Sequence, residues 1–191
     1  MDEEELKWKL IQEESIEKNE WIDIRRCTYQ FPNGSAFGPY YNFTKKSYAI
    51  IVAQDVNGKY LCVKQYRHGI DAITTEFPAG AIEQKELNAT KDKEVAALEC
   101  AKRELMEETG YASVDWTHLI TIPSSPTDAD NYAYCFLAKN CEKVTQLHLD
   151  ATEVLEPEKY SAQQIDALIK QESFQQPLHV MCWLLAKVHE K

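Results

Sequence analysis

The sequence predicts an α/β protein with a β-rich N-terminal extension. Short runs of apolar residues bounded by turn residues predict strands before residue 80 and again after residue 113. From about Asp92 the apolar spacing becomes that of a helix, and two more helical segments follow near the C-terminus. No repeat, low-complexity tract or linker interrupts the 191 residues, so we expect one α/β unit preceded by its extension.

The N-terminal extension is expected to contain a β-hairpin. The run Trp21–Tyr29 has the period of two and the composition of a half-buried strand. Pro32-Asn33-Gly34 is a strong turn signal, so Trp21–Phe31 and Ser35–Phe43 are predicted to pair. The segment Leu6–Ile16 fits either a strand or a charged helix.

Aromatic residues crowd this extension. So many in a short β segment with unprotected edges predict packing on something large, and we expect a homodimer formed through these strands. The aromatic residues are Trp8, Trp21, Tyr29, Phe31, Phe37, Tyr40, Tyr41 and Phe43.

The next strands are predicted from apolar runs and turns. Ser47–Gln54 and Lys59–Tyr66 flank a segment ending in Asn57-Gly58, a dipeptide whose residues both tolerate the positive φ of a tight hairpin turn. Thr74–Pro78 is expected to be a short strand that leads into a loop, and residues 81 to 91 are expected to be irregular.

A helix is predicted from about Asp92, with Gly110 as its left-handed C-cap. Val95, Leu98, Ala101 and Leu105 form an apolar stripe that is expected to dock on a sheet. After it, Val114–Ile122, Asn131–Lys139 and Glu153–Tyr160 are predicted strands, and Ser161–Gln171 and about Gln175–Val188 are predicted helices.

Composition excludes several classes of function. The hydrophobic content of 44% and charged content of 27% are ordinary for a soluble globular protein. A formal net charge of −10 argues against binding to nucleic acid or to anionic membranes. The N-terminus carries charges and no apolar run, which argues against a signal peptide.

The cysteines predict a reducing compartment. They are scattered, contain no C-x-x-C pair and lie among apolar or strand-like neighbours, so we expect buried free thiols and a cytoplasmic protein. They are Cys27, Cys62, Cys100, Cys135, Cys141 and Cys182.

Three glutamates near the end of the helix predicted from Asp92 indicate a metal site. Glu104, Glu107 and Glu108 share one helical face, where like charges destabilise a helix by a few tenths of a kcal/mol per pair. Their place near the negative end of the helix dipole adds to this cost. A hard divalent cation reverses the balance, and carboxylate oxygens suit Mg²⁺ or Mn²⁺.

These residues resemble the box of the Nudix hydrolase family, G-x5-E-x7-R-E-U-x-E-E-x-G-U, where U is apolar. The second half matches Arg103-Glu104-Leu105, Glu107-Glu108 and Gly110, with Tyr111 in the looser last position. Gly80 and Glu86 fit the first half, but 16 residues instead of seven separate Glu86 from Arg103. The glutamate expected to brace the loop against Arg103 is therefore either Glu86 or Glu94.

Further segments are similar to ADP-ribose and sugar-nucleotide pyrophosphatases of that family. They are Gln65-Tyr66-Arg67, Glu76-Phe77-Pro78-Ala79-Gly80 and Pro126. The resemblance covers roughly residues 20–190. It implies an α/β/α sandwich around a mixed sheet at residues 46–191, and an extension at residues 1–45 that mediates a dimer.

The resemblance also implies roles for individual residues. The metal ligands would be Glu104, Glu107, Glu108 and the backbone carbonyl of Ala79, with Arg103 among the catalytic residues. The substrate-binding candidates are Arg67, Glu76 and Trp21, of which Arg67 suits a phosphate or the terminal ribose.

The general base is the open assignment. Related enzymes often use a glutamate in the loop after the proline, whereas this loop offers Asp128 and Asp130, and Glu153 is an alternative elsewhere. The expected reaction is Mg²⁺- or Mn²⁺-dependent hydrolysis of a nucleotide sugar, with ADP-ribose giving AMP and ribose 5-phosphate. The alternatives are a GDP-mannose or other nucleotide-sugar hydrolase, and a sensor that binds a nucleotide sugar without cleaving it.

Overall fold

The computed structural model describes residues 3–149 and 153–189. The chain divides into two units: the N-terminal segment up to residue 46 together with residues 123–132, and residues 47–122 together with the remainder. No helix in the described ranges is both long and apolar enough to cross a membrane.

The N-terminal unit is a three-stranded antiparallel sheet. A short 3-10 helix (Glu3–Leu6) precedes β1 (Lys9–Lys18), β2 (Ile22–Gln30) and β3 (Ala36–Lys45), which pair in this order. The segment that fitted either a strand or a helix is thus largely strand. The predicted turn is confirmed, because the Phe31 amide donates to the Ser35 carbonyl at 2.7 Å and Gly34 has a φ of 84°.

The second unit is built on a mixed sheet. Its main path runs β11 (Leu155–Tyr160), β5 (Tyr60–Arg67), β4 (Tyr48–Asp55), β10 (Tyr132–Lys143) and β8 (Tyr111–Ala112). Three strands join the side of this path: β6 (Ala72–Glu76) on β5, β7 (Ala79–Ala81) on β4 and β9 (Asp115–Pro123) on β10. The β4–β10 pair is parallel, whereas β5 runs antiparallel to β4, β6 and β11.

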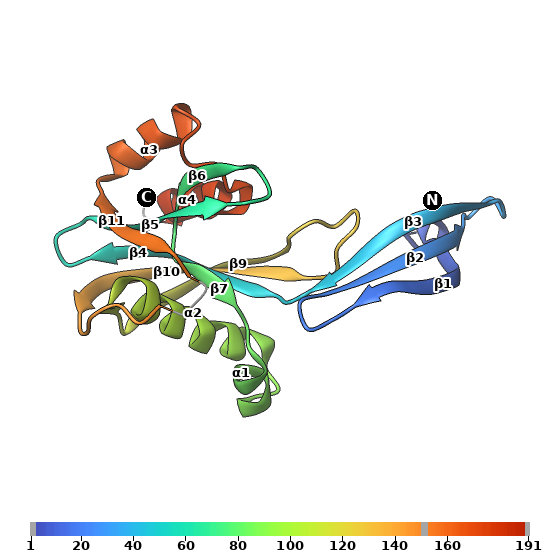
Figure 1. Cartoon of the computed structure of the whole chain (residues 1–191), viewed down its shortest axis with the longest axis horizontal. Helices are drawn as coiled ribbons and strands as arrows, with labels where there is room; N and C mark the ends of the chain where they lie inside the picture. Colours follow the sequence, from blue (N-terminus) through green and yellow to red (C-terminus); the bar gives the residue numbers. More distant parts are fainter. Residues whose placement is uncertain (1–2, 150–152, 190–191) are drawn as a thin grey trace. The chain divides into compact units, whose positions relative to one another are not determined.

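Helices cover both faces of this sheet, which is the predicted sandwich (Figure 1). The helix α2 (Lys93–Thr109) lies on one face, and α3 (Ala162–Lys170) and α4 (Pro177–His189) lie on the other. Alternate residues of β4 serve the two cores: Ile51 packs with α2, whereas Ile50 packs with α3 and α4. A strand buried on both faces reads as a continuous apolar run, as β4 does.

The expectation of an irregular segment at residues 81 to 91 is wrong, because a helix, α1 (Gln84–Ala89), forms there. A capping box starts it: the side chain of Glu83 accepts from a backbone amide of the first turn, and the Glu83 amide donates to Glu86 Oε2 at 2.6 Å. The polar composition suggested a loop, because a two-turn helix leaves too few apolar positions to show a period.

Both predicted ends of the box helix α2 are confirmed, and the predicted stripe is confirmed for Leu98, Ala101 and Leu105 but not for Val95. The Asp92 side chain caps its first turn, and Gly110 closes it with a φ of 76°. Val95, however, is 46% exposed, whereas Ala97 and Cys100 are buried. Small residues let the helix approach the sheet closely, and a search for large apolar side chains overlooks them.

The expectation that all cysteines are free thiols is also wrong. Cys135 on β10 and Cys182 on α4 form a disulfide, while Cys27, Cys62, Cys100 and Cys141 are free and buried. The paired cysteines lie 47 residues apart in sequence, and only the packing of α4 on the sheet brings them together.

Candidate functional site

The candidate site lies where the C-terminal half of α2 meets the β6–β7 loop, by which we mean Phe77 and Pro78 together with Ala79 and Gly80 at the start of β7. Three hydrogen bonds hold the backbone of this loop, and each comes from a different element. The Ala79 amide donates to Glu108 Oε2 on α2 at 3.1 Å, and the Ile51 amide of β4 donates to the Pro78 carbonyl at 2.9 Å. On the opposite side, the Phe77 amide donates to His179 Nδ1 on α4 at 3.2 Å. The loop backbone is thus a fixed wall of the site.

Gly80 permits this close approach. A Cβ atom built at Gly80 would lie 1.9 Å from Glu104 Oε1 and 2.0 Å from its carboxyl carbon. Any larger residue would therefore push the Glu104 side chain away from the loop. The glycine of the box is needed here for space.

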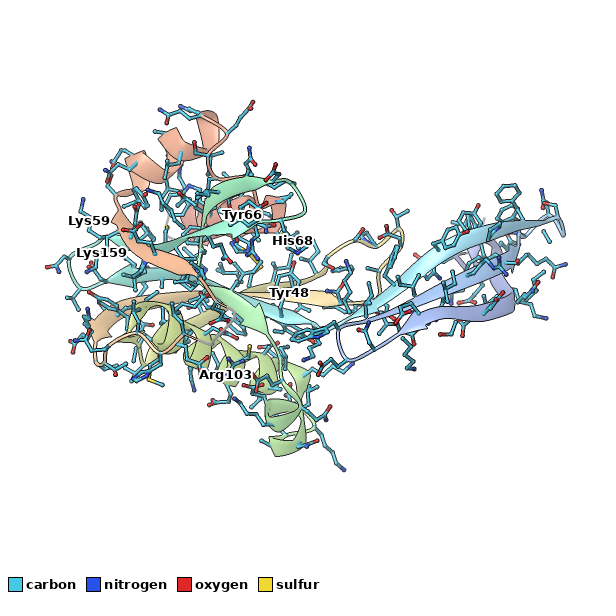
Figure 2. All side chains as sticks on the ribbon, in the orientation of Figure 1. Tyr48, Lys59, Tyr66, His68, Arg103 and Lys159 are labelled. Atoms are coloured by element: carbon cyan, nitrogen blue, oxygen red, sulfur yellow. A yellow bond between two sulfur atoms is a disulfide. The ribbon has the colours of Figure 1, made fainter. Side chains whose placement is uncertain are left out.

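Arg103 binds the glutamates of the box together. Its Nε donates to Glu86 Oε1 at 2.8 Å, and its Nη2 donates to the Ala81 carbonyl at 3.1 Å. Its Nη1 lies 2.7 Å from Glu104 Oε1 and 2.8 Å from Glu107 Oε2. Figure 2 marks Arg103 on α2, the helix that carries both of these glutamates.

The bracing glutamate is Glu86, and this answers the question that the sequence left open. Glu86 is 6% exposed and bonds directly to Arg103, whereas Glu94 faces His118 at 3.5 Å. Helix α1 carries Glu86, so the additional residues of the stretched box form the rest of α1, its connection to Asp92 and the first residues of α2. The bracing contact is thereby kept across a longer loop.

Two of the box carboxylates are buried with an unfavourable charge. Burial raises the pKa of Glu104 to about 7, and the charges of Glu107 and Glu153 add to the effect while Arg103 opposes it. Burial also raises the pKa of Glu108 well above its usual value, and the charge of Glu104 is the next contribution. Glu107 differs, since its side chain is 34% exposed.

Glu153 belongs to this group of carboxylates. It precedes β11, and its charge adds a smaller contribution, after burial, to the raised pKa of both Glu104 and Glu108. Sequence reasoning named Glu153 only as an alternative, because nothing in its local sequence resembles a motif. Its nearness to the box depends on the path of the chain between β10 and β11.

The donor set fits a hard divalent cation. In the described residues no three His, Cys, Asp or Glu side chains converge as a ready metal centre. Arg103 draws Glu104 and Glu107 toward itself, and Glu108 binds the Ala79 amide. Two buried carboxylates whose pKa values are raised, however, are the kind of ligand that a cation stabilises in its charged form.

Arg67 and Glu76 form a second charged group beside the same loop. Glu76 is fully buried, and Arg67 Nε donates to its Oε1 at 2.8 Å while Nη2 binds the other oxygen. Thr74 also donates to Glu76. Burial by itself would raise the pKa of Glu76, but the hydrogen bonds from Arg67 and Thr74 outweigh burial and lower it.

Arg67 reaches open space as well as Glu76. Its side chain is 36% exposed and lines a cavity of about 450 Å³ together with Tyr66, His68 and the residues before α4. Figure 2 marks Tyr66 and His68 at this end of β5. The guanidinium therefore keeps donors for an anion, such as a phosphate, after two have been taken by Glu76.

Three sequence-predicted residues belong to the N-terminal unit. Trp21 is 68% exposed, and the Lys46 ammonium lies 4.9 Å from its ring centre. Asp130 accepts from Arg25 at 3.0 Å and from Thr44 at 2.6 Å, and Asp128 accepts from Ser125. These contacts are all inside the N-terminal unit, and the roles assigned to Trp21, Asp128 and Asp130 stay predictions.

The same unit holds a cavity of about 350 Å³ with aromatic walls. Trp8, Tyr29 and Tyr40 line it, and their ring centres lie 5.6 to 6.1 Å apart. Asn42 and Arg25 supply polar groups. Flat rings with a few hydrogen-bonding groups are suited to stacking a nucleobase.

Comparisons with known proteins agree with this geometry. A NUDIX domain model matches residues 44–181. An ADP-ribose pyrophosphatase of Bacillus subtilis (strain 168) is 32% identical over 152 residues, which are 79% of this chain and 77% of that protein. A methanol dehydrogenase activator of Bacillus methanolicus is 31% identical over 135 residues, which are 71% of this chain and 68% of that protein.

A solved structure shares the fold. The crystal structure of an ADP compounds hydrolase superposes with a TM-score of 0.78 and covers 95% of this chain and 92% of that chain. Its sequence identity is 20%, so the likeness concerns the fold.

Proposed function

The chain belongs to the Nudix family, and on this premise we propose that it hydrolyses the pyrophosphate of a nucleoside diphosphate linked to a sugar. The leading substrate is ADP-ribose, with AMP and ribose 5-phosphate as products. The relative at 32% identity is named an ADP-ribose pyrophosphatase, which supports this choice.

One observation carries the proposal. Buried carboxylates with an unfavourable charge and the partly exposed guanidinium of Arg67 flank the same rigid loop. A pyrophosphate with its cations has complementary parts for both sides, because the cations bind carboxylates and the phosphate oxygens accept from Arg67. A neutral substrate would leave both groups unmatched.

The residues that would hold the cation are Glu104 and Glu108, with Glu107 and the backbone carbonyl of Ala79. Mg²⁺ or Mn²⁺, when bound, neutralises phosphate charge and lowers the pKa of water. Arg103 and Glu86 keep the glutamates in register, and Arg67 orients a phosphate through donors that Glu76 leaves unused.

We assign Glu153 the role of general base, with Asp128 and Asp130 as alternatives. Its carboxylate would accept a proton from the attacking water as the bond from phosphorus to the leaving phosphate breaks. The charge of Glu153 contributes to the raised pKa of both Glu104 and Glu108, which supports a place for it near the carboxylates that would hold the cation.

A substrate panel tests the proposal. The protein is incubated with ADP-ribose, GDP-mannose and other nucleotide sugars with Mg²⁺, and the products are identified by mass spectrometry. We expect AMP and ribose 5-phosphate from ADP-ribose, and no product in EDTA. A Glu104→Gln/Glu108→Gln variant purified in parallel controls for contaminating hydrolases. Turnover of none of the panel, or turnover unaffected by EDTA, contradicts the proposal.

A second candidate is a protein that binds a nucleotide sugar without cleaving it. The similarity to a protein named as a dehydrogenase activator favours keeping this candidate in the test. Its signature would be a thermal shift with ADP-ribose and no product. The complete set of Glu104, Glu107 and Glu108 speaks for catalysis, since a sensor needs no such set.

We also propose that the chain forms a homodimer through its N-terminal sheet. Every residue of β1 is exposed, although the strand and the residues before it carry several large apolar side chains. A sheet with an exposed apolar edge strand is a surface that soluble proteins cover. The exposed apolar residues are Leu6, Trp8, Leu10, Ile11 and Ile16. Light scattering at micromolar concentration is expected to give twice the chain mass of 22.0 kDa, and a monomer contradicts this.

A further inference from the structure

We propose that His179 is a positioning residue that fixes the β6–β7 loop against α2 and so sets the affinity of the site for its divalent cation. This inference rests on the proposed function, because it concerns how the cation site is held. The role of His179 is assigned through the backbone of Phe77 to Ala79, which the bond from the Phe77 amide to His179 helps to hold.

The contacts place His179 at one end of a short chain of bonds. Its Nδ1 accepts from the Phe77 amide at 3.2 Å, and two residues later the Ala79 amide donates to Glu108 at 3.1 Å. The Pro78 carbonyl between them accepts from Ile51 at 2.9 Å. The loop is therefore fastened from α4, β4 and α2, and His179 is the fastening that α4 supplies.

The position of His179 is itself well defined. The residue is 4% exposed and lies on α4, whose neighbouring Cys182 is bonded to Cys135 of β10. On the same helix, Trp183 donates to Asp166 of α3 at 2.7 Å. Since α4 is tied both to the sheet and to α3, its histidine can serve as a fixed point for the loop.

Packing in the hydrophobic core does not by itself explain why a histidine occupies position 179. Most of the residues around it are apolar, and the Phe77 ring contacts Phe174 and Trp183 with ring centres 5.1 and 6.1 Å away, while Glu76 and Arg67 are the charged groups that act on it. An aliphatic side chain would fill the space without the cost of burying an imidazole. What an aliphatic side chain lacks is an acceptor for the Phe77 amide, which otherwise would be buried without a partner.

The protonation state agrees with this role. An amide that donates to Nδ1 requires that nitrogen to be unprotonated, so the ring must be neutral. Burial lowers the pKa of His179 to about 4, and the charge of Glu76 opposes the shift while Arg67 adds to it. The acceptor is therefore present throughout the neutral pH range.

The test compares three variants by Mn²⁺ binding without substrate, followed through the electron paramagnetic resonance signal of free Mn²⁺. His179→Leu removes the acceptor, whereas His179→Asn places an oxygen at the same number of bonds from the main chain as Nδ1. Ile165→Ala is the matched control, because Ile165 of α3 is fully buried in the same core cluster as the buried residues of α4. Thermal melting of each variant reports its stability.

We expect His179→Leu to weaken Mn²⁺ binding about tenfold, which corresponds to the loss of one hydrogen bond of about 1.4 kcal/mol. His179→Asn should stay within threefold of the parent protein. Ile165→Ala should lower Tm with Mn²⁺ affinity unchanged, which separates positioning from stability.

The possible outcomes separate the role of His179 from the proposed function of the cation site. Unchanged Mn²⁺ affinity in a folded His179→Leu variant overturns the role of His179, as does equal loss in the Leu and Asn variants. If His179→Leu does not fold, a weakened affinity in His179→Asn overturns it instead. Absence of Mn²⁺ binding by the parent protein overturns the proposed function itself.

Discussion

Two buried glutamates, Glu76 and Glu108, lie on either side of the same loop and differ in what neutralises them. Both are almost inaccessible, at 0% and 4% exposure. Glu76 faces Arg67 and Thr74, and the pKa of its carboxyl is lowered. Glu108 faces Glu104 and a backbone amide, and the pKa of its carboxyl is raised chiefly by burial.

The difference shows which of the two carboxylate charges is compensated by groups of the protein itself. The charge of Glu76 is compensated by two donors of Arg67, so this pair stabilises the fold and orients a guanidinium. The charge of Glu108 has no such compensation, and a buried carboxylate without a cation is costly. A divalent cation bound beside Glu108 would remove this free-energy cost of the buried carboxylate.

The largest expected effect tests the uncompensated side of the comparison. Glu108→Gln should lower kcat for the best nucleotide sugar by about 10²–10⁴-fold, because it removes a charge that would bind the cation. In EDTA, its Tm should equal or exceed that of the parent protein, because a buried charge is gone. Glu99→Gln, at an exposed ion pair on the same helix, is the control and should leave kcat unchanged. An active Glu108→Gln variant refutes the ligand assignment.

Glu76→Gln tests the compensated side and should have the opposite effect on stability. Removing one partner of a buried pair leaves Arg67 uncompensated, so the free energy of unfolding should fall by about 3 kcal/mol in urea titrations. The KM should also rise, since Arg67 loses its fixed orientation. Glu158→Gln breaks a partly exposed pair with Lys64 and should cost less than about 1 kcal/mol. Equal losses in the two variants would contradict the comparison.

The pH dependence of stability tests the contact between α4 and the loop. His179 has a pKa of about 4 in the fold against 6.5 when unfolded, so its contribution is complete above pH 6.5 and is lost as the pH falls toward 4. Between pH 7.5 and pH 5 this amounts to about 2 kcal/mol of unfolding free energy. Glu76 on β6 and Arg67 on β5 are the charged groups that face it.

His179→Asn is the control for this pH effect, since it keeps an acceptor and cannot titrate. Urea titrations of both proteins at the two pH values should show a flatter dependence in the variant by about 2 kcal/mol. The same slope in both proteins would assign the pH effect to other groups.

The smallest expected effect concerns the brace of the box helix. Glu86→Gln weakens the bond to Arg103, so the cluster of glutamates should shift and kcat should fall about tenfold. Glu94→Gln is the matched variant, because Glu94 was the other sequence candidate and faces His118 instead. A larger loss of kcat in Glu94→Gln would show that Glu94 is the brace.

Much of the fold was predictable because local rules decided it. The capped helix ending at Gly110, the turns at Gly34 and Gly58 and the apolar run of β4 each follow from residues adjacent in sequence. The helix α1 was missed, and on α2 the stripe held for Leu98, Ala101 and Leu105 but not for Val95, for different reasons. α1 is too short to show a period, and the first turns of α2 bury alanines and a cysteine, which a search for large apolar residues overlooks.

By itself, the sequence determined the family box, the spacing of Glu104, Glu107 and Glu108, and the glycine that Glu104 requires at position 80. These are properties of one helix and one loop, where spacing along the chain equals position in space. Only the tertiary structure decided that Glu86 braces Arg103, that Glu153 lies near the box, that Cys135 pairs with Cys182 and that His179 holds Phe77. Each of these pairs joins different elements, and their nearness depends on how the helices pack on the sheet, which no local pattern records.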